Sequence, residues 1–198
     1  MPAERQFSAP VEATDAELMF RLAEGDDLAL NAIMLRWKSR VASFLYRMTS
    51  QPEAAADLAQ ETFVKLYQAR DRYRPDGNFS TYLFAIAANL ARNHARWKSR
   101  HPTISLDEED DGILSLREAV DSGLTPEEAA ASAERLRTIH TAFQALPPDL
   151  REAMTLFIHE GMGYAEISAV TGGSAKAVET RIYRARQILK EKLKDIRT

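Results

Sequence analysis

The sequence contains no cysteine, so the chain can form neither disulfides nor thiolate metal sites. A reducing cytoplasm is the simplest location for such a chain. No apolar run approaches the ~20 residues that a helix needs to span a bilayer. Residues 1–13 lack the apolar stretch of a signal peptide and are expected to form a short disordered tail. We therefore expect a protein without membrane insertion.

Motifs of catalysis and cofactor binding are also missing. The sequence has no His-Glu-x-x-His, no P-loop and no Gly-x-Gly-x-x-Gly. The acidic run at residues 107–111 does not follow the EF-hand pattern. The histidines are not spaced as metal ligands; they are His94, His101, His140 and His159. The sequence thus predicts no metal site, no cofactor and no enzymatic activity.

Strand patterns are nearly absent, whereas amphipathic helical patterns fill most of the chain. Helix start signals occur at Thr14-x-x-Glu17, Ser50-x-x-Glu53, Ser80 and Thr125-Pro126-Glu127-Glu128. A turn is expected at residues 74–78, and Pro147-Pro148 is expected to stop a helix. Helices are expected at about residues 14–25, 27–48, 50–73, 80–100, 126–146 and 149–160, followed by a helix-turn-helix.

This arrangement predicts an all-α fold of two small helical domains joined by an acidic linker. The linker is acidic, contains Gly112 and Gly123, and shows little periodicity. The expected divisions are a tail at 1–13, an N-terminal domain at 14–101, the linker at 102–125 and a C-terminal domain at 126–198.

Residues 163–186 have the pattern of a helix-turn-helix. The pair Gly172-Gly173 allows the backbone to adopt positive φ between two helices, and Ser174 can cap the second one. One side of that helix is apolar and suits the core: Val178, Ile182, Ala185 and Leu189. The opposite side can enter a major groove: Lys176, Thr180, Arg184 and Gln187.

The net charge of −3 conceals a strong polarity along the chain. Residues 80–101 carry four basic residues and no acid, and residues 164–198 carry eight basic residues against four acids. Between them, residues 102–128 carry nine acids and one arginine. Two basic surfaces separated by an acidic connector indicate two contacts with one polyanion. The alternative is that all three are solvated faces.

The helix expected at residues 80–100 has two separate stripes. The apolar stripe is Leu83, Ile86, Leu90, His94 and Trp97. The second stripe is Tyr82, Asn89, Arg92, Asn93, Arg96 and Arg100. Arginine binds phosphate and asparagine can read a base edge, so this stripe suits a nucleic-acid strand. An ordinary exposed amphipathic face is the alternative.

The combined pattern resembles the extracytoplasmic-function, or group-four, bacterial RNA polymerase sigma factors of the sigma-70 family. The resemblance covers about residues 14–198, in the family's order and with a variable linker. The matching segments are 57–67 (DLAQETFVKLY), 79–91 (FSTYLFAIAANLA), 146–152 (LPPDLRE), 164–167 (YAEI) and 178–186 (VETRIYRAR). The resemblance implies a protein that binds core RNA polymerase, recognises promoter DNA and promotes its melting. It also implies regulation by an anti-sigma factor.

The resemblance assigns a partner to each of three helices. Contacts with core polymerase are implied at Asp57, Gln60, Glu61 and Phe63. Contacts with the single-stranded minus-ten element are implied at Asn78, Tyr82, Asn89, Arg92, Asn93, Arg96 and Arg100, with Asn89 at a position that holds an extruded base. Contacts with the minus-thirty-five duplex are implied at Lys176, Glu179, Thr180, Arg181, Tyr183, Arg184 and Gln187.

Glu179 and Lys176 depart from the family pattern, which commonly has a basic residue and a glycine there. A glutamate near a groove is unfavourable against phosphate unless it accepts a hydrogen bond from cytosine N4. Glu179 is therefore either a specificity determinant or a flanking residue that pairs with solvent or a lysine.

Two other functions remain open. A stand-alone helix-turn-helix regulator would explain the C-terminal helices but would leave Asp57 and the Asn/Arg stripe without roles. A sigma-like interaction module that no longer binds DNA is disfavoured by the arginines, such as Arg92 and Arg184, on both basic surfaces.

Overall fold

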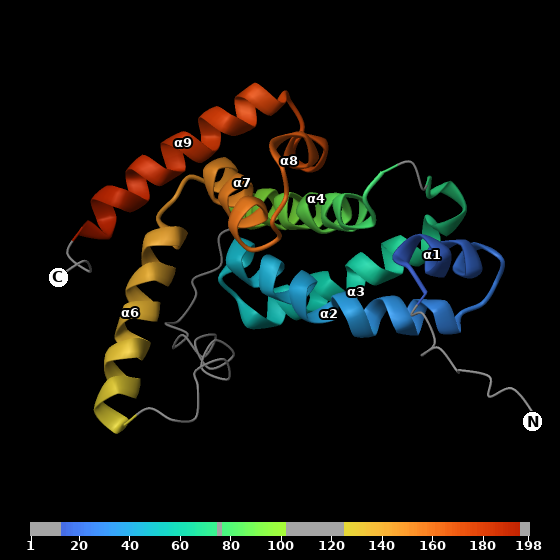
Figure 1. Ribbon diagram of the computed structural model, residues 1–198, viewed down its shortest axis with the longest axis horizontal. Helices are drawn as coiled ribbons and strands as arrows, with labels where there is room; N and C mark the ends of the chain where they lie inside the picture. Colours follow the sequence, from blue (N-terminus) through green and yellow to red (C-terminus); the bar gives the residue numbers. More distant parts are fainter. Residues whose placement is uncertain (1–12, 75–76, 102–124, 195–198) are drawn as a thin grey trace, which may run out of the picture.

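The computed structural model describes residues 13–74, 77–101 and 125–194. Within these ranges the only regular elements are helices, which confirms the expected all-α fold (Figure 1). The expected linker up to residue 124, and the expected tail except for Ala13, lie outside the described residues. None of the helices in the described ranges has the length and apolar character of a membrane-spanning segment.

The helices form two groups. The N-terminal domain (residues 13–101) contains α1 (Asp15–Ala23), α2 (Leu28–Thr49), α3 (Pro52–Gln68), the short 3-10 helix η1 (Arg70–Arg72) and α4 (Phe79–Arg100). The C-terminal domain (residues 125–194) contains α6 (Pro126–Gln144), α7 (Pro148–Ile158), α8 (Tyr164–Thr171) and α9 (Ala175–Lys192).

Aromatic side chains hold the centre of the N-terminal domain, where α2, α3 and α4 pack together. The rings of Phe44 and Phe84 are fully buried and meet edge to face, with their centroids 5.3 Å apart. Trp37 meets Phe79 in the same way at 5.6 Å. Edge-to-face pairs of this kind stabilise a core beyond the area they bury, so α4 is held firmly against α2.

Two of the expected helix starts are confirmed. Thr14 and Glu17 form a reciprocal capping box at the start of α1, and Thr125 and Glu128 form another at the start of α6. In each box the hydroxyl accepts from the backbone N–H three residues later, and the glutamate accepts from the backbone N–H of the threonine.

The other two expected caps, Ser50 and Ser80, are wrong. Ser50 lies in the left-handed region at φ 58° and closes α2 by donating its N–H to the oxygen of Tyr46 at 2.8 Å. An N-cap needs an extended backbone, which Ser50 therefore does not provide. Asn78 is the extended residue before α4, so Ser80 already lies in the first helical turn.

Two expected helix ends also differ. α3 ends at Gln68 rather than near residue 73, because a 3-10 turn follows it. Pro148 occupies the first turn of α7, where its missing N–H leaves no donor unpaired. α6 ends at Gln144, before either proline of the pair at 147–148.

The helix-turn-helix forms as the sequence predicts. Gly172 and Gly173 both have positive φ, at 79° and 95°, and they separate α8 from α9. Ser174 accepts a hydrogen bond from the N–H of Ala177 at 3.2 Å and so caps α9. The predicted apolar side of α9 is buried: Val178, Ile182, Ala185 and Leu189.

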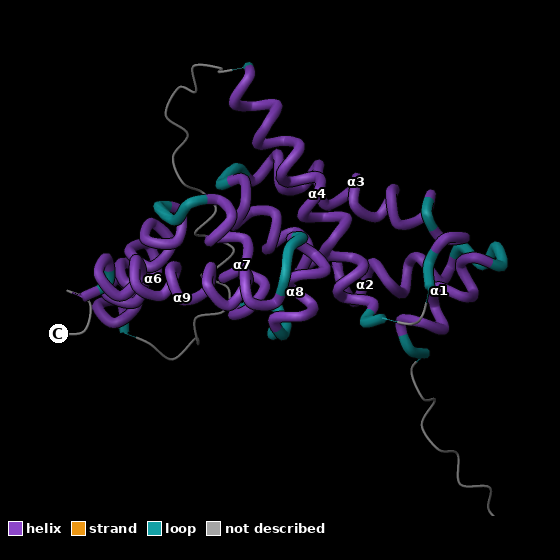
Figure 2. The backbone as a smooth tube through the Cα atoms, turned by 90° about the horizontal axis from the view of Figure 1, so that it is seen from above, coloured by secondary structure: helices purple, strands orange, loops and turns teal. Residues whose placement is uncertain are grey.

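The two domains pack against each other. α8 lies on α4, and α7 lies on α2. Figures 1 and 2 both show α7 and α8 beside α4, which places segments far apart in the sequence side by side. Their buried apolar side chains join in one continuous cluster.

Candidate polymerase and nucleic-acid interfaces

The outer face of α3 presents a short polar surface. Asp57, Gln60 and Glu61 are all exposed and share one side of the helix. Phe63, which was also expected among the polymerase contacts, is only 4% exposed and packs in the core. Its place on the surface is taken by Val64, which is 52% exposed and continues the 57, 60, 61 spacing. Sequence reasoning missed Val64, although this spacing would have placed it on the same face.

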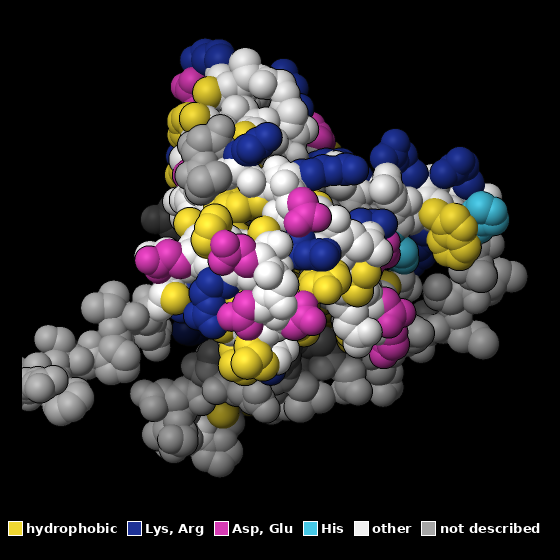
Figure 3. Space-filling model, turned by 90° about the vertical axis from the view of Figure 1, so that its right-hand side faces the viewer, with side chains coloured by type: hydrophobic (Ala, Val, Ile, Leu, Met, Phe, Trp, Pro, Cys, Tyr) yellow, Lys and Arg dark blue, Asp and Glu magenta, His cyan; other side chains and the backbone are white. Residues whose placement is uncertain are grey.

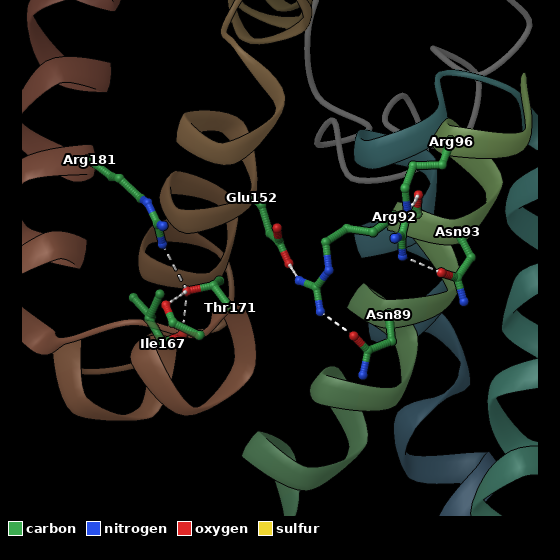
Figure 4. A network of polar contacts seen from close by, with 9 residues as sticks. Asn89, Arg92, Asn93, Arg96, Glu152, Ile167, Thr171 and Arg181 are labelled. Atoms are coloured by element: carbon green, nitrogen blue, oxygen red, sulfur yellow. Dashed lines mark hydrogen bonds and ion pairs between the residues drawn. The ribbon is translucent and has the colours of Figure 1, made fainter. Parts of the chain in front are cut away.

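The predicted polar stripe of α4 forms a hydrogen-bonded ladder (Figure 4). Arg92 donates to the side-chain oxygen of Asn89, and Arg96 donates to that of Asn93 at 2.6 Å. Arg100 continues the ladder by donating to the backbone oxygen of Arg96 at 3.2 Å. The ladder aligns amide and guanidinium groups along one side of the helix, as the helical spacing predicts.

Two members of the expected minus-ten set, Tyr82 and the exposed Asn78, contact other side chains of the protein. Tyr82 is half-buried and its ring packs against Tyr73, with centroids 5.3 Å apart. Burial raises the pKa of the Tyr82 hydroxyl, while the charge of Arg72 acts in the opposite direction. Asn78 donates its amide to Glu166 of the C-terminal domain at 2.9 Å.

The outer side of α9 is accessible, as the sequence predicts. Six of the seven expected duplex contacts are exposed: Lys176, Glu179, Thr180, Tyr183, Arg184 and Gln187. Among them, Tyr183 is 63% exposed. Figure 3 views the molecule from the right-hand side of Figure 1 and shows Lys and Arg side chains interspersed with Asp and Glu, with most of the basic ones in the upper half.

The comparisons with known proteins agree with this arrangement. Residues 33–101 match Sigma-70 region 2, and residues 136–189 match Sigma-70 region 4. The chain is 33% identical over 183 residues to the RNA polymerase sigma-H factor of Pseudomonas aeruginosa, covering 92% of this chain and 95% of that protein. The chain belongs to the sigma-70 family. It is an alternative sigma factor for transcription initiation, of the extracytoplasmic-function type.

Two further similarities support this conclusion. The sigma factor is 32% identical over 186 residues to the ECF RNA polymerase sigma-E factor of Escherichia coli, covering 93% of this chain and 97% of that one. Its fold resembles that of CnrH, solved in complex with the cytosolic domain of CnrY, with a TM-score of 0.66 and 27% identity. That similarity covers 91% of this chain and 97% of CnrH.

The last turns of α4 differ from the sequence prediction. Trp97 was expected in the buried apolar stripe, yet its ring is 52% exposed and stacks on His101 at 4.9 Å. The apolar periodicity is correct as far as Leu90, which is buried. In Figure 2 the C-terminal end of α4 extends beyond the other described helices.

Arg181 also differs from the other duplex-facing residues of this sigma factor. Its guanidinium donates to the hydroxyl of Thr171 at 3.2 Å and lies 3.8 Å from the carboxylate of Asp149. These contacts tie α9 to α8 and α7. Arg181 therefore helps to fix the orientation of α9, whereas Arg184 is fully on the outer side.

Proposed function

We propose that this sigma factor divides its contacts among three helices. The outer face of α3 binds core RNA polymerase, the Asn/Arg ladder of α4 binds the non-template strand of the minus-ten element, and α9 reads the minus-thirty-five duplex. The observation that carries the proposal is the ladder itself: two amides and three guanidiniums align along one side of α4.

The chemistry of the ladder suits a melted strand. A guanidinium can grip a phosphate with two hydrogen bonds, whatever the base. An amide offers both a donor and an acceptor, so Asn89 can distinguish one extruded base from another. Asn89 is exposed, and its neighbour one turn away is Arg92. Binding and discrimination would thus come from adjacent residues.

The polar face of α3 suits a protein partner. Asp57 and Glu61 place two carboxylates on the face that carries the exposed Val64, and the ammonium of Lys65 lies 3.7 Å from the Glu61 carboxylate. Such a surface would bind a basic helical surface of the polymerase and would be repelled by DNA phosphates.

The exposed side of α9 suits duplex DNA. The second helix of a helix-turn-helix enters the major groove through its outer, N-terminal residues. Lys176 and Thr180 lie in the first turns of α9, and Arg184 follows one turn later. Arg184 would contact a phosphate, while residues nearer the start would approach base edges.

A regulatory partner is part of the proposal. The related CnrH was solved in complex with the cytosolic domain of CnrY. By analogy, we propose that an anti-sigma protein occludes this chain in the cytoplasm. The role of the sigma factor itself would be noncatalytic: it directs core polymerase to promoters and helps to melt the start site.

Transcription in vitro tests the proposal. Core polymerase and the purified chain would be given a promoter library with randomised minus-ten and minus-thirty-five elements. We expect transcripts from a defined subset of promoters, and none with core polymerase alone. Binding to promoter duplex without polymerase, together with unchanged start-site selection, would instead identify a stand-alone helix-turn-helix regulator. Binding to neither polymerase nor DNA would identify an interaction module.

A further inference from the structure

Three side-chain pairs between the domains share one polarity, whereas the amide of Gln144 donates in the opposite direction, to the backbone oxygen of Arg47. In these three pairs the C-terminal domain contributes the carboxylate, and the N-terminal domain contributes the hydrogen-bond donor, which is cationic in two of them. The three pairs are Arg92 with Glu152, Arg40 with Glu160, and Asn78 with Glu166. Of the three carboxylates, only that of Glu152 faces the ladder of α4.

Glu152 of α7 occupies the centre of this contact (Figure 4). Its carboxylate accepts a hydrogen bond from the guanidinium of Arg92, and that guanidinium also donates to Asn89. The side chain of Glu152 is only 10% exposed, whereas that of Arg92 is 34% exposed. One member of the ladder, Arg92, is therefore already bound to a carboxylate of the C-terminal domain.

The Glu152 carboxylate is largely shielded from solvent. Burial raises its pKa above the ordinary value, although the charges of Arg92 and Arg181 act in the opposite direction. Buried ion pairs recover little net free energy, because both charges lose their hydration. A phosphate that takes over Arg92 would release Glu152 to water, so the contact is open to competition.

A second contact fastens the domains at some distance from the ladder. The guanidinium of Arg40 on α2 lies 2.8 Å from the carboxylate of Glu160, whose side chain is only 3% exposed. The same guanidinium stacks 4.5 Å above the ring of Trp37. Glu160 follows the end of α7. This pair holds the closed arrangement without touching α4, so it can be altered separately from the ladder.

We propose that the C-terminal domain is an intramolecular competitor of the minus-ten strand. In the closed chain Glu152 occupies Arg92, and it must leave before a strand phosphate can bind there. This inference rests on the proposed role of α4. Because coupling between two equilibria is reciprocal, strand binding should open the chain, and opening should tighten strand binding.

Spin labels can follow the opening directly. The chain has no native cysteine, so Leu35→Cys on α2 and Lys190→Cys on α9 give two unique labelling sites. Both positions are exposed. Double electron–electron resonance on the full chain should give one narrow distribution of distances between the two spin labels. Saturation with a single-stranded DNA 12-mer of randomised sequence should replace it with a broader and longer one.

Two variants open the chain by different routes. Glu152→Gln removes the charge that holds Arg92 while keeping the shape of α7, and Arg40→Ala removes the distant ion pair. Both should lengthen the distances and raise the affinity for the 12-mer by about fivefold or more, measured by fluorescence anisotropy. Glu134→Gln is the matched control, because it makes the same charge change at a pair internal to α6. It should leave distances and affinity unchanged.

The outcomes separate this inference from the proposed function. If the 12-mer binds the wild-type chain and leaves the narrow distribution unchanged, the competition is refuted while α4 remains a strand-binding surface. If Glu152→Gln and Arg40→Ala open the chain but neither variant binds the 12-mer, the competition and the proposed strand-binding role of α4 are both refuted. An unchanged distribution in both variants would also overturn the role given to these pairs.

Discussion

Lys176 and Glu179 form an ion pair on the outer side of α9, with the ammonium nitrogen 2.8 Å from the carboxylate oxygen. They lie one turn apart, and their side chains are 80% and 47% exposed. The hydrogen bond to Glu179 raises the pKa of Lys176. Glu179 thus has a lysine partner in the free chain. DNA would have to displace Lys176 before Glu179 could accept a hydrogen bond from a base.

This pair leads to a prediction about promoter selectivity. Glu179→Ala should change the preferred base at one position of the minus-thirty-five element. Arg184→Ala should weaken binding to all promoters alike and lower the salt slope by about one. Both would be measured as holoenzyme affinity for a panel of promoter duplexes. If both variants merely scale affinity uniformly, Glu179 is a flanking residue whose partner is Lys176.

The minus-ten ladder gives a second prediction. Asn89→Ala should relax the base preference at one minus-ten position and cost about 1–3 kcal/mol at the preferred promoter. Arg96→Ala should slow opening at every promoter, because its contact is with the strand backbone. Open-complex formation would be measured with all four bases at that position. If Asn89→Ala keeps the original base preference, the Asn89 amide does not read a base and serves only as a structural partner of Arg92.

The face of α3 gives a third prediction. Asp57→Lys reverses a charge on an exposed surface, so it should weaken assembly with core polymerase while leaving helical content intact. Asp71→Lys is the control, since it makes the same change on η1, an exposed element outside that face. Affinity for core polymerase would be measured with labelled chains. Equal affinities for the two variants would remove α3 as the polymerase-binding helix.

The turn between α8 and α9 gives a prediction about stability. Gly172 has φ 79° and ψ 161°, a backbone region that is essentially restricted to glycine. Gly172→Ala should therefore lower the free energy of unfolding by about 1–3 kcal/mol, although the space around it is open. Gly163→Ala is the control, because its φ of −74° suits any residue. Urea unfolding would compare them, and equal losses would contradict the backbone explanation.

The capping box of α1 gives a prediction about pH. The backbone N–H and hydroxyl of Thr14 donate to Glu17 and lower its pKa below the ordinary value of 4.5. A depressed pKa contributes stability that is present above pH 4.5 and lost as the pH falls through the folded-state value. Amide exchange in α1 should therefore differ between wild type and Glu17→Gln at neutral pH. The difference should vanish in acid, and one that persists there would contradict this cause.

Local features of the fold could be read from the sequence. The capping boxes at Thr14 and Thr125, the glycine turn at Gly172 and the apolar side of α9 all formed as predicted. Each depends on residues within about one helical turn, because hydrogen-bond closure and helical periodicity are local. The local pattern gave a wrong prediction at Ser50. This residue ends α2 with a positive φ, and that backbone conformation prevents it from capping the next helix.

The distribution of exposure depended on packing between elements. Periodicity places Trp97 on the same side as Leu90, but it does not say how far the neighbouring helices extend. Arg92 and Glu152 are 60 residues apart, and nothing in either local sequence relates them. The sequence by itself determined the two capping boxes and the apolar side of α9. Only the tertiary structure placed a carboxylate of α7 on the ladder of α4, because that contact depends on the relative position of two domains.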